Sequence, residues 1–159
     1  MRGYDERLAA WAERLGARVQ GERYARPEAG GEVCAVRLSP REGARVRVLV
    51  AHGTGNDAVY PLLELFRALL RAGAEVFAFD LDGHGCASTT VFAPGTGRTA
   101  VAAAAAAAER GRPPLPLHLI GHSLGGSLVL DALAAGSLDR AVSATILSAP
   151  VDVRIGART

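Results

Sequence analysis

Four short, mostly apolar runs alternate with helix-like segments along most of the chain. The runs cover residues 46–51, 75–79, 117–120 and 142–147. The segments between them carry apolar residues at helical spacing and cover residues 58–72, 99–110 and 124–135. Such runs are typical of strands buried on both faces, and their alternation with helices predicts a parallel sheet covered by helices. The predicted fold class is therefore α/β.

The residues before these runs predict one more helix and a hairpin. Residues 4–16 place Leu8, Trp11 and Leu15 on one helical face. Residues 17–26 and 32–38 have strand composition, with turn-forming residues between them. We therefore expect a sheet of about six strands in a single domain that spans residues 1–159.

The composition argues against several classes of partner. The net charge of +2 is too small to indicate nucleic acid or a membrane surface. No apolar leader and no apolar run long enough to span a bilayer occur, so we expect a cytoplasmic protein with no membrane span. The two cysteines, Cys34 and Cys86, are single and far apart, so we expect neither a disulfide framework nor a metal site.

The segment Gly121-His122-Ser123-Leu124-Gly125 joins an apolar run to a helix-like segment. A Gly-x-Ser-x-Gly sequence in this context predicts a tight, strained turn that lifts the serine hydroxyl above the sheet. A side chain at either flanking glycine would collide with the neighbouring strand or helix. The alternative is an ordinary glycine-rich turn. A phosphate-binding turn fits less well, because Gly-x-Gly-x-x-Gly is absent here and the chain has no lysine.

Two other apolar runs also end in unusual residues. His52-Gly53-Thr54 follows the first run, and the segment from Asp80 to His84 follows the second. Reactive groups in open α/β sheets collect where the strands have their carboxyl ends. These endings therefore predict a site at one edge of the sheet.

Together the three segments resemble the α/β-hydrolase family, and most closely its esterase, monoacylglycerol-lipase and serine-aminopeptidase-like members. The quoted motifs are Leu49-Val50-Ala51-His52-Gly53-Thr54-Gly55, Phe79-Asp80-Leu81-Asp82-Gly83-His84-Gly85 and Ile120-Gly121-His122-Ser123-Leu124-Gly125-Gly126. The resemblance covers roughly residues 32–150. It implies an α/β-hydrolase fold that is incomplete at its C-terminus, with the final strands missing.

The resemblance also implies roles for individual residues. Ser123 would be the catalytic nucleophile that attacks an acyl carbonyl, and the backbone N–H groups of Leu124 and Thr54 would form the oxyanion hole. His52 and His84 would be structural loop residues. No metal or organic cofactor is implied, because acyl transfer to serine needs neither. The expected partner is a small-molecule acyl substrate.

Four more residues have expected roles around this site. Asp80 and Asp82 are expected to organise their loop. His118 and His122 are not placed like the base of the family.

The pattern departs from the family after Ser123. The family's triad runs serine, then acid, then histidine, and no histidine follows Ser123. Asp152 is a weak candidate for the acid. The last strand would form an exposed apolar edge open to self-association. We therefore expect the N-terminal part of a longer hydrolase, shortened by truncation or a frameshift, which the DNA sequence beyond Thr159 would test.

Three functions remain open from the sequence. The first is a serine hydrolase that acts on an acyl ester or amide. The second is a catalytically incomplete fragment or a non-enzymatic interaction module. The third is an acyltransferase, because Gly-His-Ser-Leu-Gly also occurs in malonyl-type transferases. The His52-Gly53 loop and Gly126, where those transferases typically have Glu, favour the hydrolase. The substrate itself is not readable from these residues.

Overall fold

The computed structural model describes residues 5–26, 31–55, 59–87, 92 and 95–149. Its strands are β1 (Ala17–Arg26), β2 (Gly31–Pro40), β3 (Val46–Ala51), β4 (Ala74–Phe79), β5 (Leu117–His122) and β6 (Ala141–Leu147). Its α-helices are α1 (Asp5–Arg14), α2 (Leu63–Arg71), α3 (Thr96–Glu109) and α4 (Leu124–Ala134). Two short 3-10 turns complete the described elements, η1 (Tyr60–Leu62) and η2 (Gly85–Ala87).

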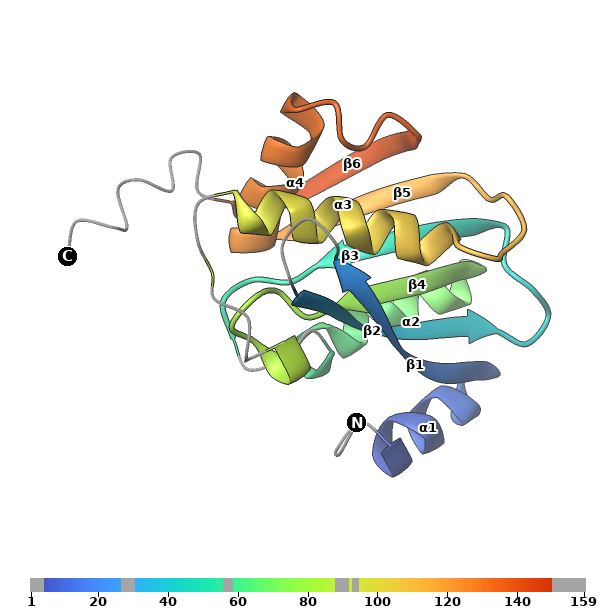
Figure 1. Cartoon of the computed structure of the whole chain (residues 1–159). Helices are drawn as coiled ribbons and strands as arrows, with labels where there is room; N and C mark the ends of the chain where they lie inside the picture. The colour runs from blue at the N-terminus through green and yellow to red at the C-terminus, as the bar shows by residue number, and fades with distance from the viewer. Residues whose placement is uncertain (1–4, 27–30, 56–58, 88–91, 93–94, 150–159) are drawn as a thin grey trace.

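The six strands form one sheet in the order β1-β2-β4-β3-β5-β6 (Figure 1). Strands β3 to β6 run parallel, whereas β2 pairs antiparallel with both β1 and β4. The hairpin, the six strands and the mostly parallel sheet confirm the fold predicted from the apolar runs. The antiparallel pairing of β2 with β1 is compatible with the short connection between them, since parallel neighbours need a crossover.

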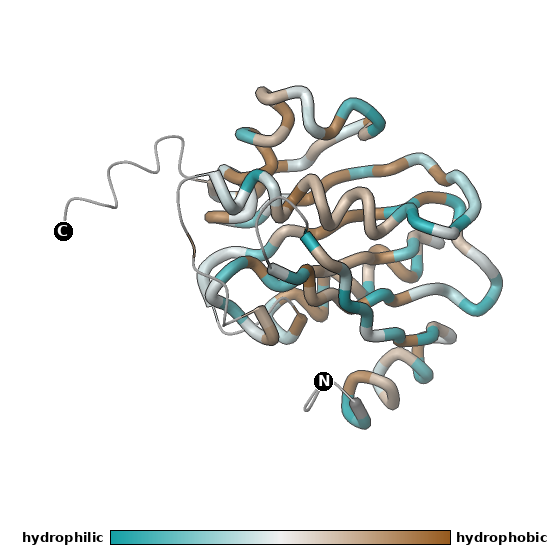
Figure 2. Tube along the Cα trace, in the orientation of Figure 1, coloured by the Kyte–Doolittle hydropathy of each residue, from teal (hydrophilic) through white to brown (hydrophobic). Residues whose placement is uncertain are grey.

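Helices cover both faces of the sheet. Buried residues of α3 and α4 pack with Leu49 and Phe77 on one face, while those of α1 and α2 pack with Val48 and Val76 on the other. Consecutive strand residues thus belong to opposite cores, as the alternation of side chains along a strand requires. The central strands and the helices against them carry much of the apolar sequence (Figure 2). This explains why β3 and β4 are buried along almost their whole length.

Local chemistry determines where the helices end. Helix α2 ends before Gly73, whose φ of +78° lies in the left-handed region that glycine tolerates best. The prolines that follow α3 prevent its extension, because proline lacks the N–H a helix needs. Many small alanines in α3 are completely buried, so this helix lies close to the sheet.

A buried network of charges lies under the C-terminal end of α3. It contains Glu22 of β1, Arg37 of β2, Arg47 of β3 and Glu75 of β4. The Arg37 guanidinium lies 2.7 Å from Glu22 and 2.6 Å from Glu75, and Arg47 lies 2.6 Å from Glu75. Arg37 also donates to the carbonyl of Ala108 on α3. The network therefore ties four strands and a helix together near the amino ends of β3 and β4.

Among the described helices, none is both long and apolar enough to cross a membrane.

Candidate functional site

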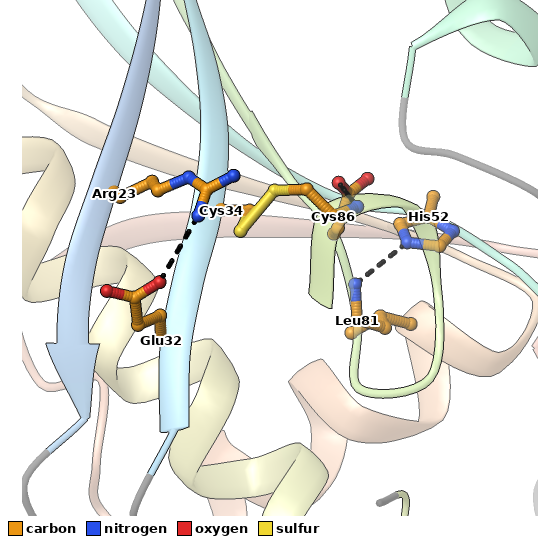
Figure 3. Close-up of a disulfide and its surroundings, with 7 residues drawn as sticks. Arg23, Glu32, Cys34, His52, Leu81 and Cys86 are labelled. Atoms are coloured by element: carbon orange, nitrogen blue, oxygen red, sulfur yellow. Dashed lines mark hydrogen bonds and ion pairs between the residues drawn. A yellow bond between two sulfur atoms is a disulfide. The ribbon is translucent and has the colours of Figure 1, made fainter. Parts of the chain in front are cut away.

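The carboxyl ends of the parallel strands bring the three predicted segments together. A side chain at Gly53, after β3, would place its Cβ 2.9 Å from the Cβ of Ser123, after β5. The backbone N–H of Leu81, after β4, donates to Nε2 of His52 at 2.9 Å (Figure 3). The segments thus lie side by side, as expected for one edge of a parallel sheet.

Ser123 stands between the end of β5 and the start of α4 in a strained backbone conformation. Its φ is +51° and its ψ is −120°, which non-glycine residues rarely adopt. The side chain is partly exposed, and its backbone N–H donates to the carbonyl of Leu147 on β6 at 2.8 Å. Strained residues of this kind cluster at functional sites, where the surrounding structure must hold them in place.

The glycines around Ser123 have no room for a side chain. A Cβ at Gly121 would lie 2.5 Å from Cα of Gly126, and a Cβ at Gly125 would lie 2.3 Å from the carbonyl oxygen of Ala51. A Cβ at Gly126 would lie 2.6 Å from Cβ of Ala149. These contacts confirm the predicted steric reason for glycine on both sides of the serine. They also leave no space for a glutamate at position 126.

Of the two residues predicted to donate backbone N–H groups, Leu124 directly follows Ser123, and Thr54 follows Gly53, which lies against Ser123. Leu124 is the first residue of α4, where helix N–H groups have no carbonyl partner within the helix. Thr54 is exposed and follows the buried Gly53. The N-terminal end of α4 also carries partial positive charge, which favours a developing anion.

The loop after β4 is organised by its two aspartates, as expected. Asp80 accepts the backbone N–H of Cys86 at 3.0 Å, and a side chain at Gly85 would collide with its carboxylate. Asp82 forms a buried ion pair with Arg26 of β1 at 2.7 Å, with both side chains almost fully buried. Both carboxylates therefore shape the loop in this structure.

We expected no disulfide framework, and this was wrong, because the structure joins Cys34 and Cys86 in a disulfide (Figure 3). They are 52 positions apart in the sequence, yet their Cα atoms lie 6.0 Å apart. Strand β2 pairs with β4, so Cys34 lies beside the loop that follows β4 and carries Cys86. Only this pairing of strands brings the two thiols together, and no local motif signals it.

Two further features near the carboxyl ends of the parallel strands were not predicted from the sequence. The Arg26–Asp82 ion pair joins residues 56 positions apart, so no local pattern predicts it. Ser148, directly after β6, shares the positive φ of +51° found at Ser123. The backbone just after the carboxyl end of β6 is thus strained, at the same end of the parallel strands as Ser123.

The histidines differ in what they contact. His52 is buried, its Nδ1 lies 2.5 Å from the carbonyl of Gly53, and its ring packs edge-on against His84 at 5.1 Å. His84 contacts the carbonyl of Asp82, and His118 contacts Ser143 on β6. His52 and His84 are therefore engaged by loop contacts, in keeping with the structural role expected for them. Asp152, the weak candidate for the acid, lies outside the described residues.

A cavity of about 660 Å³ lies away from the carboxyl ends of the parallel strands. Its walls include Gly43 and Gly73, which precede β3 and β4, and it is therefore at the amino ends of the parallel strands. Because reactive groups in such sheets collect at the carboxyl ends, this cavity is not part of the candidate site.

A strained serine on a strand-to-helix turn, in a parallel sheet with this strand order, defines the class of α/β hydrolases. The family model of the serine aminopeptidases, S33, matches residues 42–156. The chain belongs to this family.

Solved structures agree on the fold. An esterase from Pyrococcus furiosus superimposes with a TM-score of 0.74 at 16% identity, covering 87% of this chain and 52% of its own. A thermostable carboxyl esterase from Bacillus coagulans has a TM-score of 0.64 at 22% identity, covering 80% of this chain and 43% of its own. A cold-adapted esterase from an Arctic intertidal metagenomic library has a TM-score of 0.62 at 27% identity, covering 83% and 61%. Comparison with curated proteins found no match.

The chain spans about half the length of the solved structures that it matches.

Proposed function

We propose that this chain carries the nucleophile of a serine hydrolase that acts on an acyl ester or amide. The observation that carries the proposal is the backbone of Ser123, a non-glycine residue with φ of +51° between β5 and α4. Holding such a conformation costs about 1–3 kcal/mol, and such strained residues cluster at functional sites. The glycines on both sides of it are required because any side chain there would collide with the neighbouring backbone or side chains.

In the proposed reaction, Oγ of Ser123 attacks the acyl carbonyl carbon and the carbonyl oxygen becomes an oxyanion. The backbone N–H groups of Leu124 and Thr54 donate to that oxygen. The tetrahedral intermediate then collapses, the alcohol or amine leaves with a proton, and the acyl group remains on Ser123. Water then attacks the acyl group on Ser123, and the carboxylic acid leaves as the serine hydroxyl is restored. Loss of one such donor typically slows the reaction about 100- to 1,000-fold.

A serine hydroxyl needs a base to become a good nucleophile at neutral pH. No histidine follows Ser123 in the printed sequence. His52 is buried with both ring nitrogens in contact with backbone groups. We propose that the base comes from polypeptide outside the described residues, with Asp152 as a candidate for the acid.

The proposed substrate class comes from the solved structures that the chain resembles. The structural neighbours are esterases, and a carboxyl ester of a small molecule is the proposed substrate. The space around Gly126 argues against the acyltransferase alternative, because a glutamate there would collide with Ala149 and Ile146.

Labelling with a tagged fluorophosphonate tests the proposal on the polypeptide that carries the proposed base as well as Ser123. The probe forms a covalent bond with an activated serine, so we expect labelling that Ser123→Ala abolishes and that peptide mass spectrometry assigns to Ser123. Ser137→Ala, an exposed serine after α4, is the matched control and should label like the parent. Absence of labelling beside a labelled authentic hydrolase would support the alternative of an incomplete fragment or interaction module.

We further propose that the β6 edge supports self-association. Val142 and Leu147 of β6 are 61% and 39% exposed. The strand contains no charged residue to oppose pairing with another strand. Concentration-dependent mass by light scattering tests this.

The cytoplasmic location stays a prediction. Disulfides are rare in the reducing cytoplasm, so the state of Cys34 and Cys86 in intact cells tests it directly. Alkylation of both thiols before lysis supports a cytoplasmic location, and a protected pair contradicts it.

A further inference from the structure

The ring of His52 bridges the two loops that follow β3 and β4. Its Nε2 accepts the backbone N–H of Leu81 at 2.9 Å. A backbone N–H only donates, so this nitrogen carries no proton. Its Nδ1 lies 2.5 Å from the carbonyl oxygen of Gly53, which only accepts. The two contacts are therefore compatible with one form of the ring, the neutral tautomer with its proton on Nδ1.

This contact also orients one particular peptide group. In a trans peptide, the carbonyl of Gly53 and the N–H of Thr54 point in opposite directions. The described residues contain no cis peptide bond. Because His52 holds the Gly53 carbonyl toward its buried ring, the Thr54 N–H points away from that ring. Gly53 itself lies against Ser123, with a Cβ there only 2.9 Å from the Cβ of the serine.

The partner of His52 is held in place by the rest of its loop. The backbone N–H of Asp80 donates to the carbonyl of Cys34 at 2.8 Å, which joins the residue before Leu81 to β2. The Cys34–Cys86 disulfide holds the same loop to β2 (Figure 3). The Arg26–Asp82 ion pair holds it to β1. Leu81 is fully buried. The ring of His52 therefore rests on a loop anchored at several points.

We propose that His52 is a positioning residue for the acyl chemistry of Ser123. Its Nδ1–H holds the Gly53–Thr54 peptide in the orientation that leaves the Thr54 N–H free to donate to an oxyanion. This inference rests on the proposed function for its chemical consequence. The orientation of the peptide can be measured without it.

Two substitutions separate this role from simple packing. His52→Asn keeps an amide N–H near the position of Nδ1 and loses the acceptor for Leu81. His52→Gln keeps an acceptor near Nε2 and loses the donor to Gly53. We expect the rate of fluorophosphonate labelling to fall about 100- to 1,000-fold in His52→Gln, as for the loss of an oxyanion donor. His52→Asn should label at least about tenfold faster than His52→Gln, because the donor to Gly53 is retained.

His118→Gln is the matched control, because His118 lies on β5 and contacts Ser143 instead of the site loops. Circular dichroism melting shows that each variant is folded before its rate is compared. Equal rates for His52→Gln and His52→Asn, with both folded, overturn the positioning role. They would show that the ring contributes only packing.

A second measurement needs neither activity nor a variant. Long-range proton–nitrogen correlation spectra of the parent protein should show His52 with a protonated Nδ1 and an unprotonated Nε2 at neutral pH. The Thr54 amide signal should move in His52→Gln more than in His52→Asn. If the parent is not labelled while these signals appear as expected, the proposed function fails and the orienting role of His52 stands. A protonated Nε2 overturns the inference whatever the labelling result.

Discussion

The two edges of the sheet are built from opposite kinds of side chain. At one edge, β1 carries charged residues, and its Glu22 joins the buried ion pairs with Arg37 of β2. At the other edge, β6 is uncharged and most of its residues are exposed. Within the part of the chain that the structure describes, buried ion pairs therefore hold the β1 side, whereas β6 packs mainly against β5 and α4.

This difference shows how the candidate site is supported. The loops that carry His52 and Asp80 belong to the closed side, whereas Ser123 begins the helix beside the open side. The backbone N–H of Ser123 donates to Leu147 at the end of β6. Ser123 is thus held by a contact with the exposed strand β6, whereas the loop after β4 is held by the disulfide to β2 and the ion pair to β1.

The largest expected effect is at the centre of the ion network. Arg37→Met removes the guanidinium but leaves Glu22 and Glu75 buried, since the exposed fraction of each is below 10%. Removing one partner of a buried pair typically costs about 3–5 kcal/mol, and we expect this loss in the free energy of unfolding measured with urea.

Arg41→Met is the control, because the Arg41–Glu13 pair is exposed on both sides. Such pairs contribute about 0–1 kcal/mol. An equal loss in the two variants would show that the network does not stabilise the closed edge.

The next effect concerns the disulfide. Cross-linking residues 52 positions apart is expected to contribute about 4 kcal/mol by restricting the unfolded chain, and measured effects are typically about 2–4 kcal/mol. Reduction with dithiothreitol should lower the free energy of unfolding of the parent by that amount. The double variant Cys34→Ser with Cys86→Ser should unfold at the same urea concentration with and without reductant. If the reductant leaves the parent unchanged, the pair does not stabilise this edge.

A smaller effect is a dependence on pH. Burial alone would raise the pKa of Glu75, but the hydrogen bond from Arg47 and the charges of Arg37 and Arg47 outweigh it and hold that pKa below its ordinary value of about 4.5. The carboxylate therefore contributes its full stability above that pH. The contribution is lost as pH falls below it and through the lower pKa of the folded state.

Urea unfolding between pH 3 and 7 measures this contribution. The parent should exceed Glu75→Gln in stability by a constant amount above about pH 4.5, and the gap should shrink at lower pH. Glu64→Gln, in the exposed pair with Arg67, should show no such narrowing. A gap that stays constant down to pH 3 would contradict the lowered pKa.

The parts of the fold that follow from local sequence were predictable. The apolar runs predicted β3 and β4 because both faces of those strands are buried. The turn at Ser123 was predictable because its steric demand falls on residues two and three positions away. Arg47 and Glu75 lie within the apolar runs, and their burial depends on the strands pairing side by side. The disulfide and the contact between His52 and Leu81 also join segments that only the folded sheet brings together.

The smallest expected effect on stability is at the open edge, where the effect on association is the larger one. Val142 of β6 is 61% exposed, so Val142→Lys should change the free energy of unfolding by about 0.5 kcal/mol or less. A lysine on an unpaired edge strand opposes pairing with another strand, so association of the parent at high concentration should be lost. Ala25→Lys places the same charge on the exposed face of β1 and should leave that association intact. Light scattering over a range of concentrations distinguishes the outcomes. Association that survives in Val142→Lys but not in Ala25→Lys would assign the contact to the charged edge and reverse the comparison between the two.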